Sequence, residues 1–218
     1  MRAVIVGASG VMGREMLLLS GKNDFFVCGG FDERTPVETA EDLSADVVIE
    51  FAAAAATEKT LLYALRYNLP AVIGTTGHSA SQLKNITRAA EKIPVFYAAN
   101  FSLGMAALIP AAKSLAGFMP GAEITVIETH RRGKTDCPGG SAKLIGEALS
   151  GRAEIVSVRR GDVKGKHEII FTLEDQTVTL SHEAVSRGAF TSGAVAAAKY
   201  LMDKKPGLYG MEDLINDN

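Results

Sequence analysis

The sequence predicts an α/β protein in which a doubly wound parallel sheet is followed by a second domain of α+β type. Up to about residue 102, short apolar runs alternate with helical stretches, the pattern of parallel strands joined by crossover helices. Beyond that point, three strand candidates follow one another with few residues between them, and short connections are typical of antiparallel neighbours. The 218 residues suffice for two modest domains, each with a core.

The chain opens with a predicted strand at Arg2–Val6, a turn rich in glycine and a helical stretch from Arg14 to Leu19. Small residues let the backbone approach a pyrophosphate, and the helix N-terminus faces the phosphates. This Rossmann-like order predicts a dinucleotide site in the turn formed by Gly7, Ala8, Ser9, Gly10, Val11, Met12 and Gly13.

Asp32 follows the second predicted strand, Phe25–Phe31, about 20 residues past the glycines. An acidic side chain there accepts hydrogen bonds from the adenosine ribose and repels the 2′-phosphate of NADP, so Asp32 favours NADH. Arg34 favours NADPH instead. The structural alternative for Asp32 is a plain turn residue.

Two further strands end in turns that suit a ligand. A strand is predicted at Asp46–Phe51, a helix capped by Thr57 and running through Arg66, and a strand at Pro70–Ile73 that ends in Gly74, Thr75, Thr76 and Gly77. A helix from Ser79 to Lys92 then precedes a strand at Pro94–Ala98, which ends in Ala99, Asn100 and Phe101. Open α/β sheets bind ligands at the carboxyl ends of their strands. A single such turn is often only a tight connection, but three at successive strand ends favour a ligand site.

The second domain begins with an apolar helix. Its predicted elements are a helix at Met105–Phe118, a strand at Ala122–His130, a helix at Gly140–Leu149, and strands at Ile155–Arg160, His167–Leu173 and Thr177–Glu183. The last strand has one apolar face, because Val178 and Leu180 alternate with polar residues.

Composition excludes several classes of protein. A hydrophobic content of 47%, 22% charged residues and a net charge of −2 are ordinary for a soluble globular protein and give no nucleic-acid footprint. Cys28 and Cys137 have neither metal-ligand nor disulfide-framework spacing, so no metal is expected. No apolar run approaches the roughly 20 residues of a membrane span, and nothing before the first strand resembles a signal peptide. We expect a cytoplasmic protein without a membrane partner.

A basic stretch, Glu128 to Ala142 (ETHRRGKTDCPGGSA), carries the strongest chemical signal. Because apolar residues alternate before it, Glu128 and His130 should lie on one face of their strand. Arg131, Lys134 and a glycine turn before Ser141 suit a small dianion, since arginine matches a carboxylate and a helix N-terminus favours negative charge. His130 has the one unperturbed pKa here near neutrality. A solvated basic turn is the alternative.

This stretch resembles the signature of the dihydrodipicolinate reductase (4-hydroxy-tetrahydrodipicolinate reductase) family, usually E-x-H-H-x-x-K-x-D-A-P-S-G-T-A. It keeps register without an insertion, and the matching residues are Glu128, His130, Lys134, Asp136, Pro138, Gly140 and Ala142, with Ser141 in place of threonine. Three residues depart from the signature. Arg131 stands where a second histidine is usual, Cys137 replaces alanine, and Gly139 replaces serine.

The resemblance extends over nearly the whole chain. The turn Gly74–Gly77 is identical to the family's turn at the nicotinamide and substrate, Ala99–Gly104 is close to A-N-F-S-x-G, and Ser186–Phe190 resembles the stretch that returns the chain to the first domain. The resemblance therefore implies a dinucleotide-binding domain of residues 1–102 and 187–218. It also implies a substrate-binding and oligomerisation domain of residues 103–186, whose open mixed sheet packs against other subunits in a homotetramer.

The resemblance also implies an activity and a set of residues. The family is an NAD(P)H-dependent oxidoreductase of lysine and diaminopimelate biosynthesis that reduces a small dicarboxylate heterocycle. It implies His130 and Lys134 as catalytic residues and Thr76, Arg131, Gly140 and Ser141 as substrate contacts. Besides Gly7 to Gly13, the implied cofactor contacts are Asp32, Phe51, Gly74, Thr75, Thr76, Ala99, Asn100, Phe101, Lys134 and Phe190. Many family members accept both cofactors, so NADH is placed first and NADPH second.

Two other classes of protein stay open. Another Rossmann dehydrogenase of amino-acid metabolism would keep the glycine turn and lack the set from His130 to Ser141. A non-catalytic NAD(H)-binding sensor would share the first domain but should carry a basic DNA-binding helix, and the sequence shows none.

Overall fold

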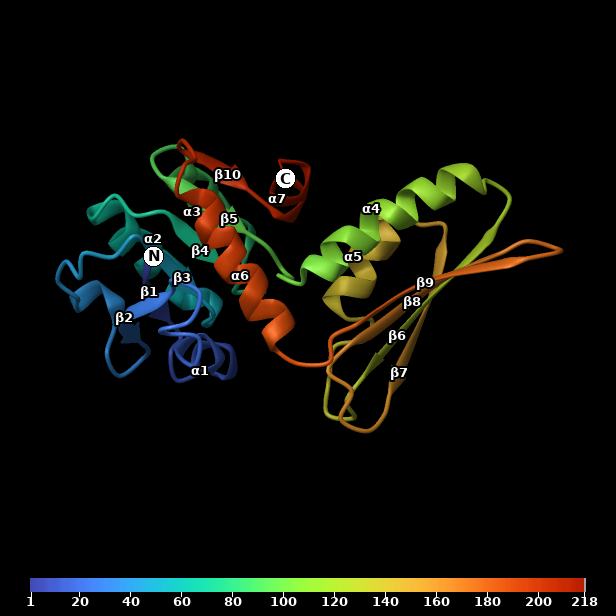
Figure 1. Cartoon of the computed structure of the whole chain (residues 1–218), viewed down its shortest axis with the longest axis horizontal. Helices are drawn as coiled ribbons and strands as arrows, with labels where there is room; N and C mark the ends of the chain where they lie inside the picture. Colours follow the sequence, from blue (N-terminus) through green and yellow to red (C-terminus); the bar gives the residue numbers. More distant parts are fainter. Residues whose placement is uncertain (218) are drawn as a thin grey trace. The chain divides into compact units, whose positions relative to one another are not determined.

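A computed structural model describes residues 1–217, and the chain forms two compact units (Figure 1). The first unit contains residues 1–101 and the chain from Phe190 onward, and the second unit contains Ser102–Ala189. Among the described residues, no helix is long and apolar enough to cross a membrane.

The first unit is built on a six-stranded sheet in which every pair of neighbours is parallel. Its strands lie in the order β10-β5-β4-β3-β1-β2. They are β1 (Arg2–Val6), β2 (Phe26–Phe31), β3 (Val47–Glu50), β4 (Ala71–Ile73), β5 (Pro94–Tyr97) and β10 (Gly207–Tyr209). The strand order reverses at β1, and in open α/β sheets this reversal marks the place where ligands bind.

Helices cover both faces of this sheet, which explains why its strands are continuously apolar. In β1, Val4 and Val6 belong to the core under α2 (Thr57–Arg66) and α3 (Ala80–Ala90). Ala3 and Ile5 belong to the core on the other face. That second core also holds residues of α1 (Val11–Leu17), α6 (Gly188–Leu201) and α7 (Met211–Asn216). The predicted doubly wound sheet is therefore confirmed.

Several sequence predictions for the first unit were wrong in detail. Helix α1 begins at Val11 and not at Arg14, so the last three residues of the predicted turn, Val11 to Gly13, are already helical and Gly10 is the N-cap. Thr57 does not cap α2; it is the first helical residue, and its hydroxyl donates a 2.7 Å hydrogen bond to the buried carboxylate of Glu50. Strand β10 was not predicted, since three residues carry too little periodicity.

The second unit contains a four-stranded mixed sheet in the order β7-β6-β8-β9. Its strands are β6 (Glu123–His130), β7 (Ala153–Arg159), β8 (Lys166–Thr172) and β9 (Thr177–Glu183). Strands β6 and β7 pair in parallel, whereas β8 is antiparallel to both β6 and β9. The mixed sheet agrees with the prediction, but the expectation that β7 and β8 are neighbours was wrong. Helix α5 (Gly140–Ala148) forms a crossover between β6 and β7, and such a crossover joins parallel strands.

Helices α4 (Leu103–Phe118) and α5 pack on one face of this sheet (Figure 1). Their core contacts include Val126 of β6 and Ile169 and Phe171 of β8, all of which are fully buried. Side chains alternate between the faces of a strand, so Glu128 and His130 continue the row of Val126 toward the helices. The face that holds the core therefore also carries the polar residues described next.

Candidate active site

The glycine turn of the first unit leaves no room for a side chain at Gly7. Gly7 has φ +85°, and a Cβ there would overlap the carbonyl oxygen of Phe51, which follows β3. Gly10 is the N-cap of α1 without a side-chain hydrogen bond, and the first turn of the helix contains no acidic residue. Backbone amides and a positive helix end are thus presented to an incoming phosphate, so this turn fits a dinucleotide pyrophosphate.

A cavity of about 930 Å³ lies beside this turn and is bounded by Ser9, Gly10, Asp32, Arg34 and Phe51, among others. Asp32 accepts hydrogen bonds from the backbone amides of Arg34 (2.9 Å) and Thr35 (3.2 Å). These bonds, with one from the Ser9 hydroxyl, hold the pKa of Asp32 below its ordinary value, the Arg34 amide contributing most. Asp32 therefore shapes its own turn and presents an ionised carboxylate at the cavity.

The turns after β4 and β5 contain both buried and exposed members of the predicted cofactor set. Thr75 is buried, and its hydroxyl accepts a 2.9 Å hydrogen bond from the Ala52 amide. Phe101 is 2% exposed and packs edge to face on Phe51, with ring centroids 5.6 Å apart. Thr76 and Ala99 are exposed. Thr75 and Phe101 thus connect the strand ends, whereas Thr76 and Gly77 are exposed at the surface of their turn.

The remaining predicted cofactor residues of the first unit differ in their exposure to solvent. Gly13 is buried, Val11 is exposed, and Gly74, Asn100 and Phe190 are half-buried. Ala8 and Met12 are also half-buried. Some of the predicted cofactor residues are therefore buried or half-buried around the ends of β1, β3, β4 and β5, and a smaller number are accessible to a ligand.

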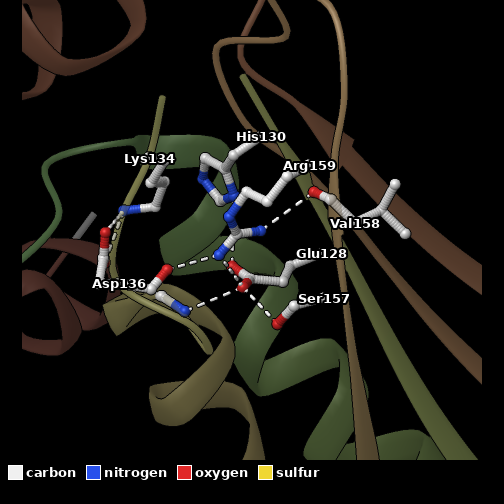
Figure 2. A network of polar contacts seen from close by, with 8 residues as sticks. Glu128, His130, Lys134, Asp136, Ser157, Val158 and Arg159 are labelled. Atoms are coloured by element: carbon white, nitrogen blue, oxygen red, sulfur yellow. Dashed lines mark hydrogen bonds and ion pairs between the residues drawn. The ribbon is translucent and has the colours of Figure 1, made fainter. Parts of the chain in front are cut away.

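In the second unit, the fully buried carboxylate of Glu128 is the centre of a polar network (Figure 2). Its Oε1 atom accepts hydrogen bonds from the Gly139 amide (3.0 Å), the Ser157 hydroxyl (2.7 Å) and Nη2 of Arg159 (2.7 Å). Burial alone would raise the pKa of Glu128, but these hydrogen bonds outweigh burial and hold the pKa below its ordinary value. Glu128 forms an ion pair with Arg159, whose side chain is half-buried.

His130 lies directly beside this network, and its side chain is 12% exposed. Its Nδ1 atom is 3.2 Å from Oε2 of Glu128, within ion-pair distance, and neither atom has a hydrogen-bond partner among residues 1–217. Burial lowers the pKa of His130 below its ordinary value, and the charge of Glu128 offsets this only in part. His130 is therefore neutral near pH 7.

Lys134 is held in the loop that follows β6. Its Nζ atom lies 2.6 Å from both carboxylate oxygens of Asp136. This hydrogen bond lowers the pKa of Asp136, so the ammonium faces an ionised partner. Arg131 and Gly140 are exposed and Ser141 is half-buried at the start of α5. The structure thus gathers all the predicted second-unit residues at one end of β6.

Sequence reasoning missed three residues of the network: Ser157, Arg159 and His167. In the sheet, Glu128 stands opposite Ser157 on one side and His167 on the other, and His130 stands opposite Arg159. The strand–helix–strand order of β6, α5 and β7 was a usable signal for the parallel pair. Because antiparallel neighbours were expected instead, Arg159 was not placed beside His130.

One group of side chains has the composition of a metal site. Ligand atoms of Glu128, His130 and His167 lie within 4.8 Å of one another. The guanidinium of Arg159, 2.7 Å from the same carboxylate, already supplies a positive charge and disfavours a cation there. The sequence expectation of a metal-free site stays a prediction.

The buried His167 is expected to make the free energy of unfolding depend on pH in the acid range. Its side chain is 3% exposed, and burial, with a smaller effect from His130, lowers its pKa to about 4. Between about pH 6.5 and pH 4 the unfolded chain binds the extra proton, so the free energy of unfolding falls as the pH drops. We expect urea unfolding to show a loss of about 2–3 kcal/mol between about pH 7 and pH 4.5 from this residue. His167→Gln should remove this part of the pH dependence. If the free energy of unfolding of the variant depends on pH as in the wild type, His167 is not its source.

Comparison with known proteins gives matches over nearly the whole chain. The family model "Dihydrodipicolinate reductase, N-terminus" matches residues 1–101, and "Dihydrodipicolinate reductase, C-terminus" matches residues 104–215. A 4-hydroxy-tetrahydrodipicolinate reductase of Caldanaerobacter subterraneus subsp. tengcongensis is 36% identical, covering 98% of each chain. The protein of the same name from Xanthomonas campestris pv. campestris is also 36% identical, covering 98% of this chain and 97% of its own.

A solved structure agrees with the fold. The dipicolinate-bound dihydrodipicolinate reductase from Paenisporosarcina sp. TG-14 matches with a TM-score of 0.82 and 23% identity, covering 98% of each chain. The other Rossmann dehydrogenase and the NAD(H)-binding sensor are not favoured by these matches. Two family models that together span nearly all residues, and relatives at 36% identity, lead to one assignment. The chain belongs to the dihydrodipicolinate reductase family.

Proposed function

We propose that the chain is an oxidoreductase that reduces 4-hydroxy-tetrahydrodipicolinate to tetrahydrodipicolinate with NADH or NADPH, a step of lysine and diaminopimelate biosynthesis. The single observation that carries this proposal is that His130 and Lys134 lie beside the ion pair of Glu128 and Arg159 (Figure 2), in a chain whose relatives bear this enzyme's name. In the net reaction the substrate gains a hydride and a proton and loses a water molecule.

The first unit is proposed as the dinucleotide-binding domain. The bare turn at Gly7 and Gly10 fits a pyrophosphate, and Asp32 offers an ionised carboxylate to a ribose at the adjoining cavity. When bound, the reduced nicotinamide supplies the hydride. Repulsion between Asp32 and a 2′-phosphate makes NADH the preferred cofactor, while the exposed Arg34 leaves NADPH as a second one.

The second unit is proposed as the substrate domain. Arg131 and the backbone at Gly140 and Ser141 are exposed enough to hold a carboxylate, and Thr76 of the first unit is assigned a second contact. Nζ of Lys134 is paired with the carboxylate of Asp136, whereas burial lowers the pKa of His130 below its ordinary value. We therefore propose Lys134 as the proton donor and His130 as a neutral hydrogen-bonding group at the reacting atoms.

The proposal is tested by a coupled assay in which dihydrodipicolinate synthase supplies the unstable substrate. The loss of nicotinamide absorbance is followed with NADH and NADPH side by side. We expect turnover with both and a higher kcat/KM with NADH. No oxidation of either nucleotide, with a family member active under the same conditions, would disprove the proposed reaction.

Arg131 is proposed to bind a substrate carboxylate with both arms of its guanidinium. Arg131→Ala should raise KM for the substrate by about 10–100-fold and change kcat much less, because binding lost equally from the ground and transition states appears in KM. Arg132, also exposed, provides a matched control as Arg132→Ala. An unchanged KM in Arg131→Ala would remove Arg131 from the substrate site.

We further propose a homotetramer that works in the cytoplasm. The second sheet has α4 and α5 on one face, and apolar residues such as Ile127, Val156 and Ile170 alternate to the other, where Val156 is 39% exposed. A second subunit would bury this face. Both cysteines, Cys28 and Cys137, are free thiols, as suits a reducing compartment.

A further inference from the structure

The two oxygens of Glu128 have very different surroundings. Oε1 is surrounded by three donors from separate segments: the Gly139 amide, the Ser157 hydroxyl and the Arg159 guanidinium. Oε2 has none of these partners and faces Nδ1 of His130 at 3.2 Å. The carboxylate is fully buried. One oxygen therefore fixes the side chain, and the other is directed at the histidine.

Arg159 ties this carboxylate to the loop that carries Lys134. Its Nη2 atom, 2.7 Å from Glu128, also donates a 2.5 Å hydrogen bond to the carbonyl oxygen of Asp136. Nη1 donates to the carbonyl of Val158 at 3.0 Å. The guanidinium of Arg159 therefore bonds to groups of the protein itself, whereas Arg131 is exposed. A single rigid side chain thus links the network at His130 to the segment of the Lys134–Asp136 ion pair (Figure 2).

Gly139 makes room for this arrangement. A Cβ at position 139 would lie 2.7 Å from Oε2 of Glu128 and 3.2 Å from Cε of Lys134. The carboxylate oxygen therefore occupies the space in which a side chain at 139 would begin. This gives a local reason for glycine at a position where the family signature usually has serine.

We infer that Glu128, anchored by Arg159, is a positioning residue that selects the Nδ1–H tautomer of His130 and holds its ring beside Lys134. A carboxylate can only accept, so the imidazole nitrogen that faces Oε2 must carry the hydrogen. Nε2 then keeps its lone pair and serves as the accepting atom at the reaction site. The inference rests on the proposed function only for its kinetic consequence, and the tautomer itself is a property of the free protein.

Glu128→Gln provides a sharp test because the three donors dictate how the new amide must lie. Its carbonyl oxygen has to take the place of Oε1, which leaves the NH₂ group facing His130 Nδ1. Nδ1 must then accept, and the hydrogen moves to Nε2. We expect the two-bond ¹H–¹⁵N spectrum of the full-length protein to show the Nδ1–H tautomer in the wild type and the Nε2–H tautomer in the variant. The titration of His130 should also move to lower pH, since the charge of Glu128 raises its pKa.

Kinetics provide the second readout. Glu128→Gln should lower kcat by about 10–100-fold, because His130 would then present Nε2–H in place of an accepting Nε2 at the reacting atoms, with KM for the nucleotide unchanged. In a His130→Gln background the same change should have little further effect, because both act through one imidazole. Glu168→Gln is the matched control: Glu168 is also a strand residue with a cationic partner, Lys166 at 2.8 Å, but belongs to the other face.

A second variant covers the case in which Glu128→Gln does not fold. Gly139→Ala should displace Oε2 and produce a mixture of tautomers, together with a smaller loss of kcat. An unchanged tautomer in both variants overturns the inference, and so does a loss of kcat that is fully additive with His130→Gln. If the wild type lacks reductase activity, the proposed function fails, whereas the spectra of the free protein still decide the role of Glu128.

Discussion

Replacing Lys134 with methionine is expected to lower kcat by about 10²–10⁴-fold, the contribution of a positioned proton donor. Methionine keeps the length of the side chain and removes the ammonium, which lies 2.6 Å from both oxygens of Asp136. The proton then has no source at the reacting carbon, and negative charge that develops on the substrate has no counter-charge. The measurement is the rate of nicotinamide oxidation at saturating substrate and nucleotide.

A matched control separates this effect from the loss of an ion pair. Lys166 forms a similar pair with Glu168, at 2.8 Å, but lies on the other face of the sheet. Lys166→Met should therefore retain wild-type kcat. Equal losses in the two variants, or near-full activity in Lys134→Met, would exclude Lys134 as the proton donor.

The second large effect is expected for His130→Gln. Glutamine keeps a polar group of similar reach but does not titrate, and we expect kcat to fall by about 10²-fold or more. KM should change less, because the carboxylate contacts are assigned to Arg131, Gly140 and Ser141. The measurement is kcat and KM for the substrate at fixed, saturating nucleotide.

The pH dependence of the reductase activity provides a second test of the role of His130. Burial lowers the pKa of His130, so wild-type activity that needs the neutral ring should decline only at a pH below the ordinary histidine range. His130→Gln should lose this acid limb of the profile. Retention of full activity with the same acid limb would show that another group is responsible.

Features with a local cause were predictable from the sequence. The stretch from Gly7 to Gly13 follows a strand and runs into helix α1, so its place at the end of β1 required no knowledge of distant contacts. Asp32 was placed by its distance along the chain, and it does border the cavity beside that turn. Alternation in β6 likewise placed Glu128 and His130 on one face, where they lie 3.2 Å apart.

Contacts between residues that are distant in the sequence were predicted less well than these local features. Arg159 reaches Glu128 only because β7 lies parallel to β6, and short connections had suggested a different neighbour. Thr57 was expected to cap α2, but the buried Glu50 needs a donor and takes its hydroxyl. Neither contact can be predicted from a local sequence pattern. Arg159 is distant from Glu128 in the chain, and Glu50 is buried only by the packing of the folded unit.

The central claim is that a dianionic substrate is held by the basic loop after β6, beside His130 and Lys134. It is tested most directly by an NMR titration of the ¹⁵N-labelled protein with dipicolinate, an unreactive dianion, in the presence of NADH. We predict that the signals of Arg131, Lys134, Gly140 and Ser141 shift together with one Kd and that Arg131→Ala weakens this Kd. Saturable binding that leaves these four signals unmoved would contradict the claim.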